Sequence, residues 1–247
     1  MQRDEQRDEK KGGKRESRIV FPEYKAKEFL KEYAPSLTIP KNFMIDLKDA
    51  KSMIESKKIN EKIYAKYAKK LEIFNFCAAV KIVSDNIVHK TDVGAIKIVQ
   101  DKDQFFSALS SMIKIADKFK AKGFMIEEFV DGQELIIGIK RDGVFGHVLV
   151  FGIGGIFVEI LKDVSFRACP ITMEDAESMI NELKSKKILL GARGKKYDLD
   201  SLKKTLVAIS KIPLTKEGMK IEELDINPFM LNEHDGKVVD ARIVFEN

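Results

Sequence analysis

Two short runs of β-forming residues, at positions 78–83 and 95–99, enclose a polar connection. This stretch constrains the chain most, because two such runs so close together favour an antiparallel hairpin. A turn needs little more than a glycine, an asparagine or an aspartate, whereas this one carries hydroxyls, carboxylates, an ammonium and an imidazole. The groups belong to Ser84, Asp85, His89, Lys90, Thr91 and Asp92. We therefore interpret the rest of the chain around a hairpin with a chemically reactive tip.

His89 is the most informative residue of that tip. Its imidazole could carry a phosphoryl group as a nucleophile, act as a general base, or bind a metal ion. It could equally be an exposed polar residue without a special role, because short motifs often match by chance. The remainder of the chain has to decide between these interpretations.

The composition excludes several classes of protein. The 247 residues, 44% of them hydrophobic, suffice for one large domain or two small ones. The charged N-terminus and the lack of a run of about 18 apolar residues predict no membrane span, no signal peptide and a cytoplasmic location. A net charge of only +5 does not indicate the concentrated basic face that a nucleic-acid binding protein presents. Cys77 and Cys169 lack the paired spacing of a zinc site, which predicts two buried thiols.

The sequence divides into three parts. Residues 1–18 alternate in charge and lack a large apolar side chain after Met1, which predicts a disordered tail. Residues 19–126 combine helical patterns with short β runs, whereas residues 127–247 begin with strand patterns. We predict an α/β (α+β) chain of two lobes, with a ligand cleft between them.

Apolar spacing places the elements within these lobes. Helices are expected over residues 22–34, 47–56, 61–71, 173–187 and 198–212. A further helix, the fourth in the chain, is expected to begin at a cap formed by Asp101 or Asp103 and to run to Lys122. Strands are expected over residues 42–45, 124–130, 134–141, 148–152, 221–226 and 237–245. We expect Gly123 to end the fourth helix, and the Asp131-Gly132 and Asp142-Gly143 pairs to turn the chain between strands of one antiparallel sheet.

Several polar residues could serve phosphoryl transfer in such a cleft. The reaction needs cations on the phosphates and oxygen ligands for magnesium. Lys81 could supply a positive charge, although edge strands also use lysines to prevent aggregation. Asn227 and Asp240 carry the oxygens that magnesium prefers, but they could also be an ordinary turn residue and an ordinary strand-end residue.

Two further segments are compatible with the same chemistry. Glu127 and Glu128, near the junction of the lobes, could hold a ribose or an adenine edge, or could lie on a solvated strand. The glycines at 152, 154 and 155 would let backbone amides approach a phosphate, or would only bend the chain. Neither segment decides the function by itself.

Six segments, found in the same order, carry a resemblance to a known family. They are K-I-V-S-D-N-I-V-H-K-T-D-V-G at 81–94, E-L-I-I-G-I-K-R-D at 134–142, V-F-G-I-G-G-I-F-V-E-I-L-K-D-V-S-F-R at 150–167, G-A-R-G at 191–194, E-L-D-I-N-P at 223–228 and V-D-A-R at 239–242. Across residues 22–245 the chain resembles the nucleotide-binding β subunits of NDP-forming acyl-CoA synthetases. In particular it resembles that of archaeal ADP-forming acetyl-CoA synthetase, and it is similar to the β chain of succinyl-CoA synthetase. The resemblance implies an ATP-grasp fold.

The resemblance also implies roles for individual residues. His89 is expected to be a phosphohistidine on a mobile segment, steadied by the carboxylate of Asp225. Lys81 is expected to contact the nucleotide phosphates, and Asn227 and Asp240 to bind Mg²⁺. Further nucleotide contacts are expected from the adenine-holding hinge of Glu127, Glu128, Phe129 and Val130, and from the phosphate-site residues Gly154, Gly155, Glu159 and Arg193.

A reaction and a partner follow from the same resemblance. The implied reaction is the reversible conversion of acyl-CoA, ADP and phosphate to acid, ATP and CoA, with Mg²⁺ as cofactor. The CoA-binding and acyl-transfer domains of the family would be supplied by an α subunit, in an α2β2 heterotetramer. Two departures stand out: Ala95 replaces a second glycine of the family, and the segment before Lys81 lacks the usual glycine-proline pattern.

Two other functions stay open at this point. An ATP-grasp ligase of the carboxylate-amine kind would use an acyl phosphate without a phosphohistidine. A nucleotide-sensing or scaffold subunit would bind ATP and pass on no phosphate. The preferred acid does not follow from the sequence, because acyl selectivity is expected in the α subunit. The choice between ADP and GDP also stays open.

Overall fold

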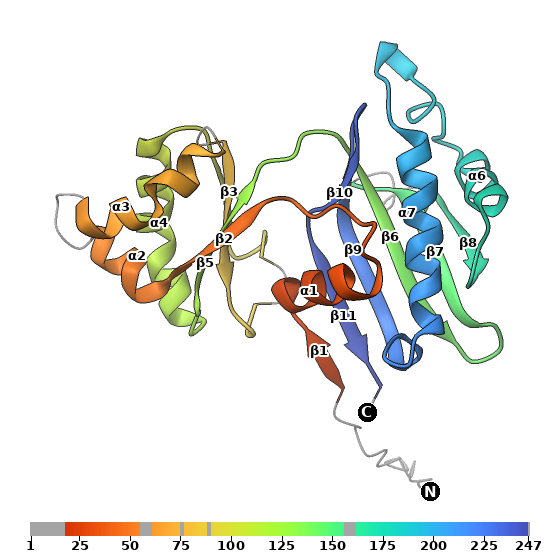
Figure 1. The fold of residues 1–247 in the computed structure, drawn as a ribbon, viewed down its shortest axis with the longest axis horizontal. Helices are drawn as coiled ribbons and strands as arrows, with labels where there is room; N and C mark the ends of the chain where they lie inside the picture. Colours follow the sequence, from red (N-terminus) through yellow and green to blue (C-terminus); the bar gives the residue numbers. More distant parts are fainter. Residues whose placement is uncertain (1–17, 55–60, 75–76, 88–89, 156–161, 247) are drawn as a thin grey trace, which may run out of the picture.

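A computed structural model describes residues 18–54, 61–74, 77–87, 90–155 and 162–246, arranged as two β-sheets with helices packed against each (Figure 1). Three of the sequence predictions lie outside the described residues: the tail up to residue 17, His89 and Glu159. The described residues contain no helix whose length and hydropathy would allow it to cross a membrane.

The smaller sheet is antiparallel and has the strand order β2-β5-β3-β4. Its strands are β2 (Asn42–Asp46), β3 (Ala78–Val83), β4 (Ile96–Val99) and β5 (Gly123–Glu128). Helices α2 (Leu47–Ile54), α3 (Glu61–Glu72) and α4 (Lys102–Lys118) gather beside this sheet (Figure 1). The hairpin predicted from the sequence is confirmed as β3 and β4, and β3 is buried along its whole length because β5 pairs with its other edge.

The larger sheet has the order β1-β11-β9-β6-β7-β8, with β10 also paired to β9. Its strands are β1 (Ile19–Phe21), β6 (Gln133–Asp142), β7 (Gly146–Ile153), β8 (Val164–Ala168), β9 (Ile221–Leu231), β10 (Gly236–Val238) and β11 (Ala241–Phe245). Helices α1 (Glu23–Tyr33), α6 (Met173–Glu182) and α7 (Leu199–Lys211) accompany it, with short 3-10 turns η1 (Ala192–Gly194), η2 (Ile212–Leu214) and η3 (Gly218–Lys220).

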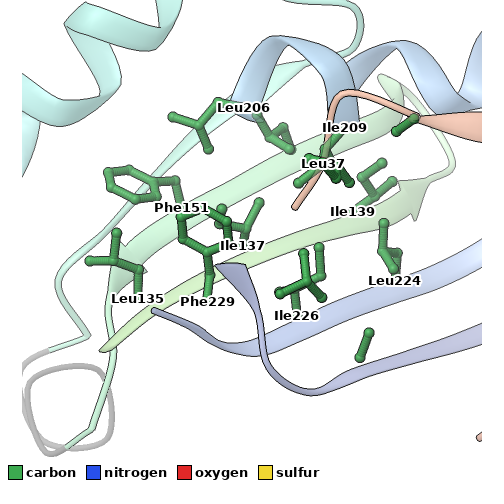
Figure 2. Packing of buried hydrophobic residues seen from close by; sticks show 14 of the residues in the cluster. Leu37, Leu135, Ile137, Ile139, Phe151, Leu206, Ile209, Leu224, Ile226 and Phe229 are labelled. Atoms are coloured by element: carbon green, nitrogen blue, oxygen red, sulfur yellow. The ribbon is translucent and has the colours of Figure 1, made fainter. Parts of the chain in front are cut away.

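One face of the larger sheet forms an apolar core. Leu206 and Ile209 of α7 pack against Ile137 and Ile226 of neighbouring strands (Figure 2). Successive side chains of a strand point to opposite faces, so the residues between these buried positions face away from the helices. Strands β6 and β9 therefore have a second, more polar face on the side opposite to the apolar core, and this face includes Asp225 of β9.

Two helix boundaries differ from the prediction. The helix α4 starts as expected, because the Asp101 carboxylate accepts a hydrogen bond from the backbone amide of Gln104 at 2.7 Å, but it ends at Lys118 and not at Lys122. The helix α6 begins with a capping box between Thr172 and Asp175 and stops at Glu182. The backbone leaves the helical conformation soon after each end, at Lys120 with a φ of +51° and at Leu183 with an extended conformation.

Gly123 has a different role from the predicted helix stop. It is the first residue of β5 and packs so tightly on β2 that an added Cβ would lie 2.2 Å from the carbonyl oxygen of Ile45. Strand β5 pairs with β2 and β3, so the Asp131-Gly132 pair connects the two sheets and does not form a hairpin within one sheet. The second predicted turn, at Asp142-Gly143, does join two neighbouring strands, β6 and β7.

The last predicted strand is interrupted. Residues 237–245 divide between β10 and β11, with Val239 and Asp240 in the break. The backbone amide of Asn227 donates to the carbonyl oxygen of Asp240 at 3.2 Å, which places these two residues side by side at the edge of the break. Residues 19–21 also join the larger sheet, because β1 pairs with β11. The division into lobes at residues 126 and 127 stays a prediction.

Candidate functional site

A buried group of charged residues lies where elements of the two sheets meet, and we call it the ionic cluster. Three of its members are lysines and three are carboxylates. They are Glu23 and Lys27 of α1, Lys81 of β3, Lys90 of the β3–β4 connection, Glu127 of β5, and Asp240 between β10 and β11. Because the members come from five separate segments, the cluster ties the smaller sheet to the larger one.

Lys81 is at the centre of the ionic cluster. Its ammonium group, with only 3% of the side chain exposed, donates to Glu23 Oε1 at 2.8 Å, Glu127 Oε1 at 2.6 Å and the carbonyl oxygen of Val239 at 2.8 Å. An ammonium has three N–H donors, so all of them are used. Burial opposes the charge, but the carboxylates of Glu23, Glu127 and Asp240 raise the pKa of Lys81 above its usual range.

The position of Lys81 overturns one of its two interpretations. Strand β3 lies between β4 and β5, so this lysine does not protect a sheet edge. A contact with nucleotide phosphates would require it to exchange at least one of its present partners.

The sequence analysis missed the two cluster members on α1. Lys27 Nζ lies 2.8 Å from Glu23 Oε1 and 2.5 Å from Glu127 Oε2. Although burial of Glu23 opposes its ionisation, the charges of Lys81, Lys27 and Lys90 hold the pKa of that carboxyl below its usual range. A sequence signal did exist, because a Glu and a Lys four residues apart share one side of a helix, here the side buried with Ala26 and Leu30.

Lys90 brings the hairpin tip into the ionic cluster. Its Nζ lies 2.8 Å from Glu23 Oε2 and 3.3 Å from Asp240 Oδ2, and 13% of its side chain is exposed. Burial works against the ammonium charge, but Glu23 and Asp240 outweigh it and raise the pKa of Lys90. Lys90 directly follows His89 in the chain, and His89 itself lies outside the described residues.

Asp240 and Asn227, whose backbones lie side by side, each carry a side-chain oxygen that could bind a metal ion. The Asp240 side chain is 28% exposed, and burial together with the charge of Glu23 raises its pKa despite the opposing lysines. Asn227 is exposed at the surface of β9. No group of three or more His, Cys, Asp or Glu residues suited to a metal is found within the described residues. Carboxylate and amide oxygens nevertheless suit Mg²⁺, which commonly takes one or two protein ligands and completes its shell with phosphates and water.

Asp225 lies on the same strand, two residues before Asn227. It sits between Leu224 and Ile226, whose side chains are buried in the apolar core, so its carboxyl faces the opposite, polar side of the sheet. Burial, and then the charges of Glu223 and Asp240, raise the pKa of Asp225, while Arg242 on the neighbouring strand lowers it.

The expected adenine hinge runs from the end of β5 into the link between the sheets. The Glu127 side chain is fully buried and pairs with Lys27 and Lys81, so the alternative of a solvated strand is wrong for this residue. Glu128 pairs with Lys237 Nζ at 3.1 Å. Phe129 is 41% exposed and Val130 is buried.

The glycine-rich segment approaches β6 closely. The amide of Gly154 donates to the carbonyl oxygen of Glu134 at 2.8 Å, and an added Cβ would lie 3.1 Å from the carbonyl carbon of Glu134. Gly155 has a φ of +68°, which favours glycine. The expected phosphate ligand Arg193 lies in η1, after Gly191. A side chain at position 154 would therefore crowd Glu134, and the backbone conformation favours glycine at position 155, both independently of any ligand.

The two cysteines take no part in this arrangement. Cys77 and Cys169 are half-buried free thiols, less deeply placed than the sequence predicted. Burial raises the pKa of the Cys169 thiol to about 11, which keeps it protonated near neutral pH.

The comparison with known families now decides the class of the chain. The ATP-grasp domain family matches residues 16–245, nearly the whole of the sequence. The chain belongs to the ATP-grasp family. Both the fold class and the resemblance inferred from the six segments are thereby confirmed.

Among curated ATP-grasp proteins, this chain is 38% identical to the β subunit of acetate–CoA ligase (ADP-forming) I of Pyrococcus furiosus. The match covers 92% of this chain and 91% of that subunit. It is 40% identical to acetate–CoA ligase (ADP-forming) of Methanocaldococcus jannaschii, over 90% of this chain but only 30% of that protein. The match thus spans nearly the whole of a β subunit in one relative and less than a third of a longer protein in another.

Solved structures agree with this placement. This chain is 32% identical to the dinucleotide-forming acetyl-coenzyme A synthetase 1 of Ca. Korarchaeum cryptofilum, whose structure was solved in complex with coenzyme A and Ca-AMPCP. That likeness has a TM-score of 0.76 and covers 92% of this chain and 93% of the other. A second structure of the same protein, with coenzyme A and Mg-AMPPCP, has a phosphohistidine segment pointing towards the nucleotide binding site and a TM-score of 0.71.

Proposed function

We propose that this chain is the nucleotide-binding β subunit of an ADP-forming acetyl- or acyl-CoA synthetase. The overall reaction converts acyl-CoA, ADP and phosphate reversibly to the free acid, ATP and CoA. The observation that carries the proposal is the match to nearly the whole length of a β subunit with this activity in Pyrococcus furiosus. The proposal includes a cytoplasmic location.

His89 carries the phosphoryl group in this proposal. A lone pair of the neutral imidazole attacks the γ-phosphorus of ATP, a nitrogen–phosphorus bond forms, and the bond from that phosphorus to the bridging oxygen breaks, so that ADP leaves with the electron pair. The reverse step gives ATP. The phosphohistidine segment of the Ca. Korarchaeum cryptofilum relative, which points towards its nucleotide site, supports this role.

The charges around the tip support the same chemistry. Lys81 and Lys90 bring two ammonium groups to the same carboxylate, Glu23, and these ammonium groups would balance the charge of phosphate oxygens. Asp225 would steady the phosphorylated imidazole by accepting a hydrogen bond from its other ring nitrogen. Asn227 and Asp240 would hold a magnesium ion, which when bound neutralises phosphate oxygens and orients them. The hinge residues Glu127 to Val130 and the segment with Gly154, Gly155, Glu159 and Arg193 would complete the nucleotide site.

An α subunit with the CoA-binding and acyl-transfer domains completes the proposal. Two relatives from Pyrococcus furiosus are named β subunits, which supports a separate partner chain. Longer relatives, of which this chain covers 26% and 30%, are compatible with fusion of the same parts into one polypeptide. We propose an α2β2 assembly.

Reconstitution tests this function. The chain is mixed with a candidate α subunit, acetyl-CoA, ADP, phosphate and Mg²⁺, and ATP formation is followed for the wild type and for His89→Ala and His89→Gln. We expect ATP from the wild type and none above background from either variant. Full turnover by His89→Ala would favour another ATP-grasp carboxylate ligase. Tight ATP binding without phosphoryl exchange under any partner condition would favour a nucleotide-sensing subunit.

A further inference from the structure

Lys27 of α1 is the lysine of the ionic cluster to which the proposed function gives no role. We propose that Lys27 is a positioning residue for Lys81: its ammonium neutralises the carboxylate of Glu127 when Lys81 turns from that carboxylate to the nucleotide phosphates. Lys27 acts in this way without touching the nucleotide. The inference rests on the nucleotide site of the proposed function and adds to it the means by which Lys81 becomes free to bind phosphate.

Lys81 has no hydrogen-bond donor to spare in this structure. Its ammonium donates to Glu23 Oε1 at 2.8 Å, to Glu127 Oε1 at 2.6 Å and to the carbonyl oxygen of Val239 at 2.8 Å. Because an ammonium has three N–H donors, a hydrogen bond to a phosphate oxygen has to replace one of these contacts. The side chains of Glu23 and Glu127 are both buried, so a carboxylate that Lys81 gives up is not solvated by water instead.

Glu127 depends on Lys27 once Lys81 has left. Among the described residues its carboxylate has two cationic partners, Lys81 on Oε1 at 2.6 Å and Lys27 on Oε2 at 2.5 Å. The two lysines use different oxygens, so departure of Lys81 leaves the contact with Lys27 intact. A buried charge without a partner is strongly unfavourable. Without Lys27, the unpaired carboxylate of Glu127 would therefore keep Lys81 in its present position.

Glu23 does not depend on Lys27 to the same extent. Its Oε1 contacts both Lys81 and Lys27 at 2.8 Å, and its Oε2 lies 2.8 Å from Lys90 Nζ. When Lys81 leaves, Glu23 thus keeps one lysine on each oxygen. The exchange of partners is accordingly decided at Glu127.

The position of Lys27 suits a residue that acts through another one. Its side chain is only 4% exposed and lies on the side of α1 that is buried with Ala26 and Leu30. Helix α1 packs on β11 of the larger sheet, whereas Lys81 and Glu127 belong to strands of the smaller sheet. Lys27 therefore supplies its charge to the smaller sheet from outside it, and it can stay in place while Lys81 moves.

The test compares the binding of two ligands that differ only in their phosphates. Titration calorimetry on the full chain measures the Kd of ATP and, by competition in the same buffer, the Kd of adenosine. Adenosine reports whether the rest of the nucleotide site is intact, because it cannot bind through a phosphate. The variants are Lys27→Met, the double variant Lys27→Met/Glu127→Gln, and the matched control Lys31→Met. Lys31 is an exposed lysine one turn further along α1 and has no ion pair with the described residues.

We expect Lys27→Met to raise the Kd of ATP at least about tenfold, which corresponds to about 1.4 kcal/mol. The Kd of adenosine should change less than about twofold, because the loss concerns the contact between Lys81 and phosphate. The double variant should bring the Kd of ATP back to within about threefold of the wild type, since a neutral amide at position 127 no longer holds Lys81. Lys31→Met should leave both constants unchanged.

A merely structural role of Lys27 gives a different result. Equal weakening of ATP and adenosine by Lys27→Met, or no change in either, would overturn the proposal. Should Lys27→Met fail to fold, the double variant decides, because it leaves no carboxylate at position 127 without a partner. Its ratio of the two constants should then lie within about threefold of the wild-type ratio, and a tenfold preference lost for ATP would overturn the proposal. Failure of the proposed function looks different, because the wild type itself would then bind no ATP.

Discussion

The substitution Lys81→Met tests whether the ionic cluster holds the two sheets together. The cluster contains three lysines and three carboxylates, so its formal charge is 3 − 3 = 0, and removing Lys81 leaves 2 − 3 = −1 in a buried site. The methionine has a similar volume and makes none of the three hydrogen bonds. The carbonyl oxygen of Val239 loses its ammonium donor at the same time.

The expected size of the effect follows from these contacts. Breaking a buried ion pair by removing one partner costs about 3–5 kcal/mol. Glu23 and Glu127 both keep Lys27 as a partner, so we expect the lower end, about 3 kcal/mol of the free energy of unfolding. The control Lys66→Met removes an ion pair with Asp49 from a lysine that is 60% exposed. Such exposed pairs contribute about 0–1 kcal/mol.

Urea unfolding at neutral pH, followed by circular dichroism, measures both variants. We also expect the double variant Lys81→Met/Glu127→Gln to be more stable than Lys81→Met alone, because it removes the excess negative charge. A loss for Lys81→Met no larger than that of Lys66→Met would refute the reasoning. So would a double variant in which the two losses simply add.

The remaining predictions concern the metal, acid and backbone packing. Asp240→Ala should weaken ATP binding with Mg²⁺ much more than without it in calorimetric titrations, and equal losses would count against a metal ligand. The pKa of Glu23 is lower in the folded chain than its ordinary value of 4.5. Its ionised carboxylate therefore contributes fully to the free energy of unfolding above pH 4.5, and this contribution is lost as the pH falls through the pKa of the folded state. Glu23→Gln should thus reduce the slope of the free energy of unfolding against pH, in the acid range, by up to about 1.4 kcal/mol per pH unit. An unchanged slope would contradict this. Gly123→Ala should cost about 3 kcal/mol in urea unfolding, whereas Gly143→Ala, with nothing within 4 Å of the new Cβ, should cost far less.

Local patterns in the sequence predicted most elements correctly. The β3–β4 hairpin, the cap of α4 by Asp101 and the start of α6 at Thr172 each depend on residues close together in the chain, so short-range rules suffice. The helix over 22–34 was also predicted, and α1 occupies Glu23–Tyr33.

Long-range pairing could not be predicted in the same way. The lysine at 81 meets carboxylates that are 58 and 46 residues away in the sequence, so its burial was not foreseen. The pattern of β5 predicted a strand but not its sheet, because alternation of apolar residues does not say which strand lies alongside. Gly123 was misinterpreted for that reason, since its need for glycine arises from Ile45 of a distant strand.

The candidate site shows the same division. His89 was singled out because its segment carries several polar residues, Asp240 because it follows a β run, and Asp225 because its segment resembles that of a known family. Glu23 and Lys27 were missed because their motif is a common helical ion pair. Their partners on β3 and β5 become neighbours only in the folded chain.

The most direct test of the central claim is to incubate the chain with γ-phosphate-labelled ATP and Mg²⁺, with and without a candidate α subunit, and to compare the wild type with His89→Ala. We predict a label that is labile in acid and stable in alkali, as a phosphorus–nitrogen bond requires, and that is absent from the variant. A wild type that binds ATP tightly beside a competent partner and takes up no label, or an equal label on His89→Ala, would contradict the account.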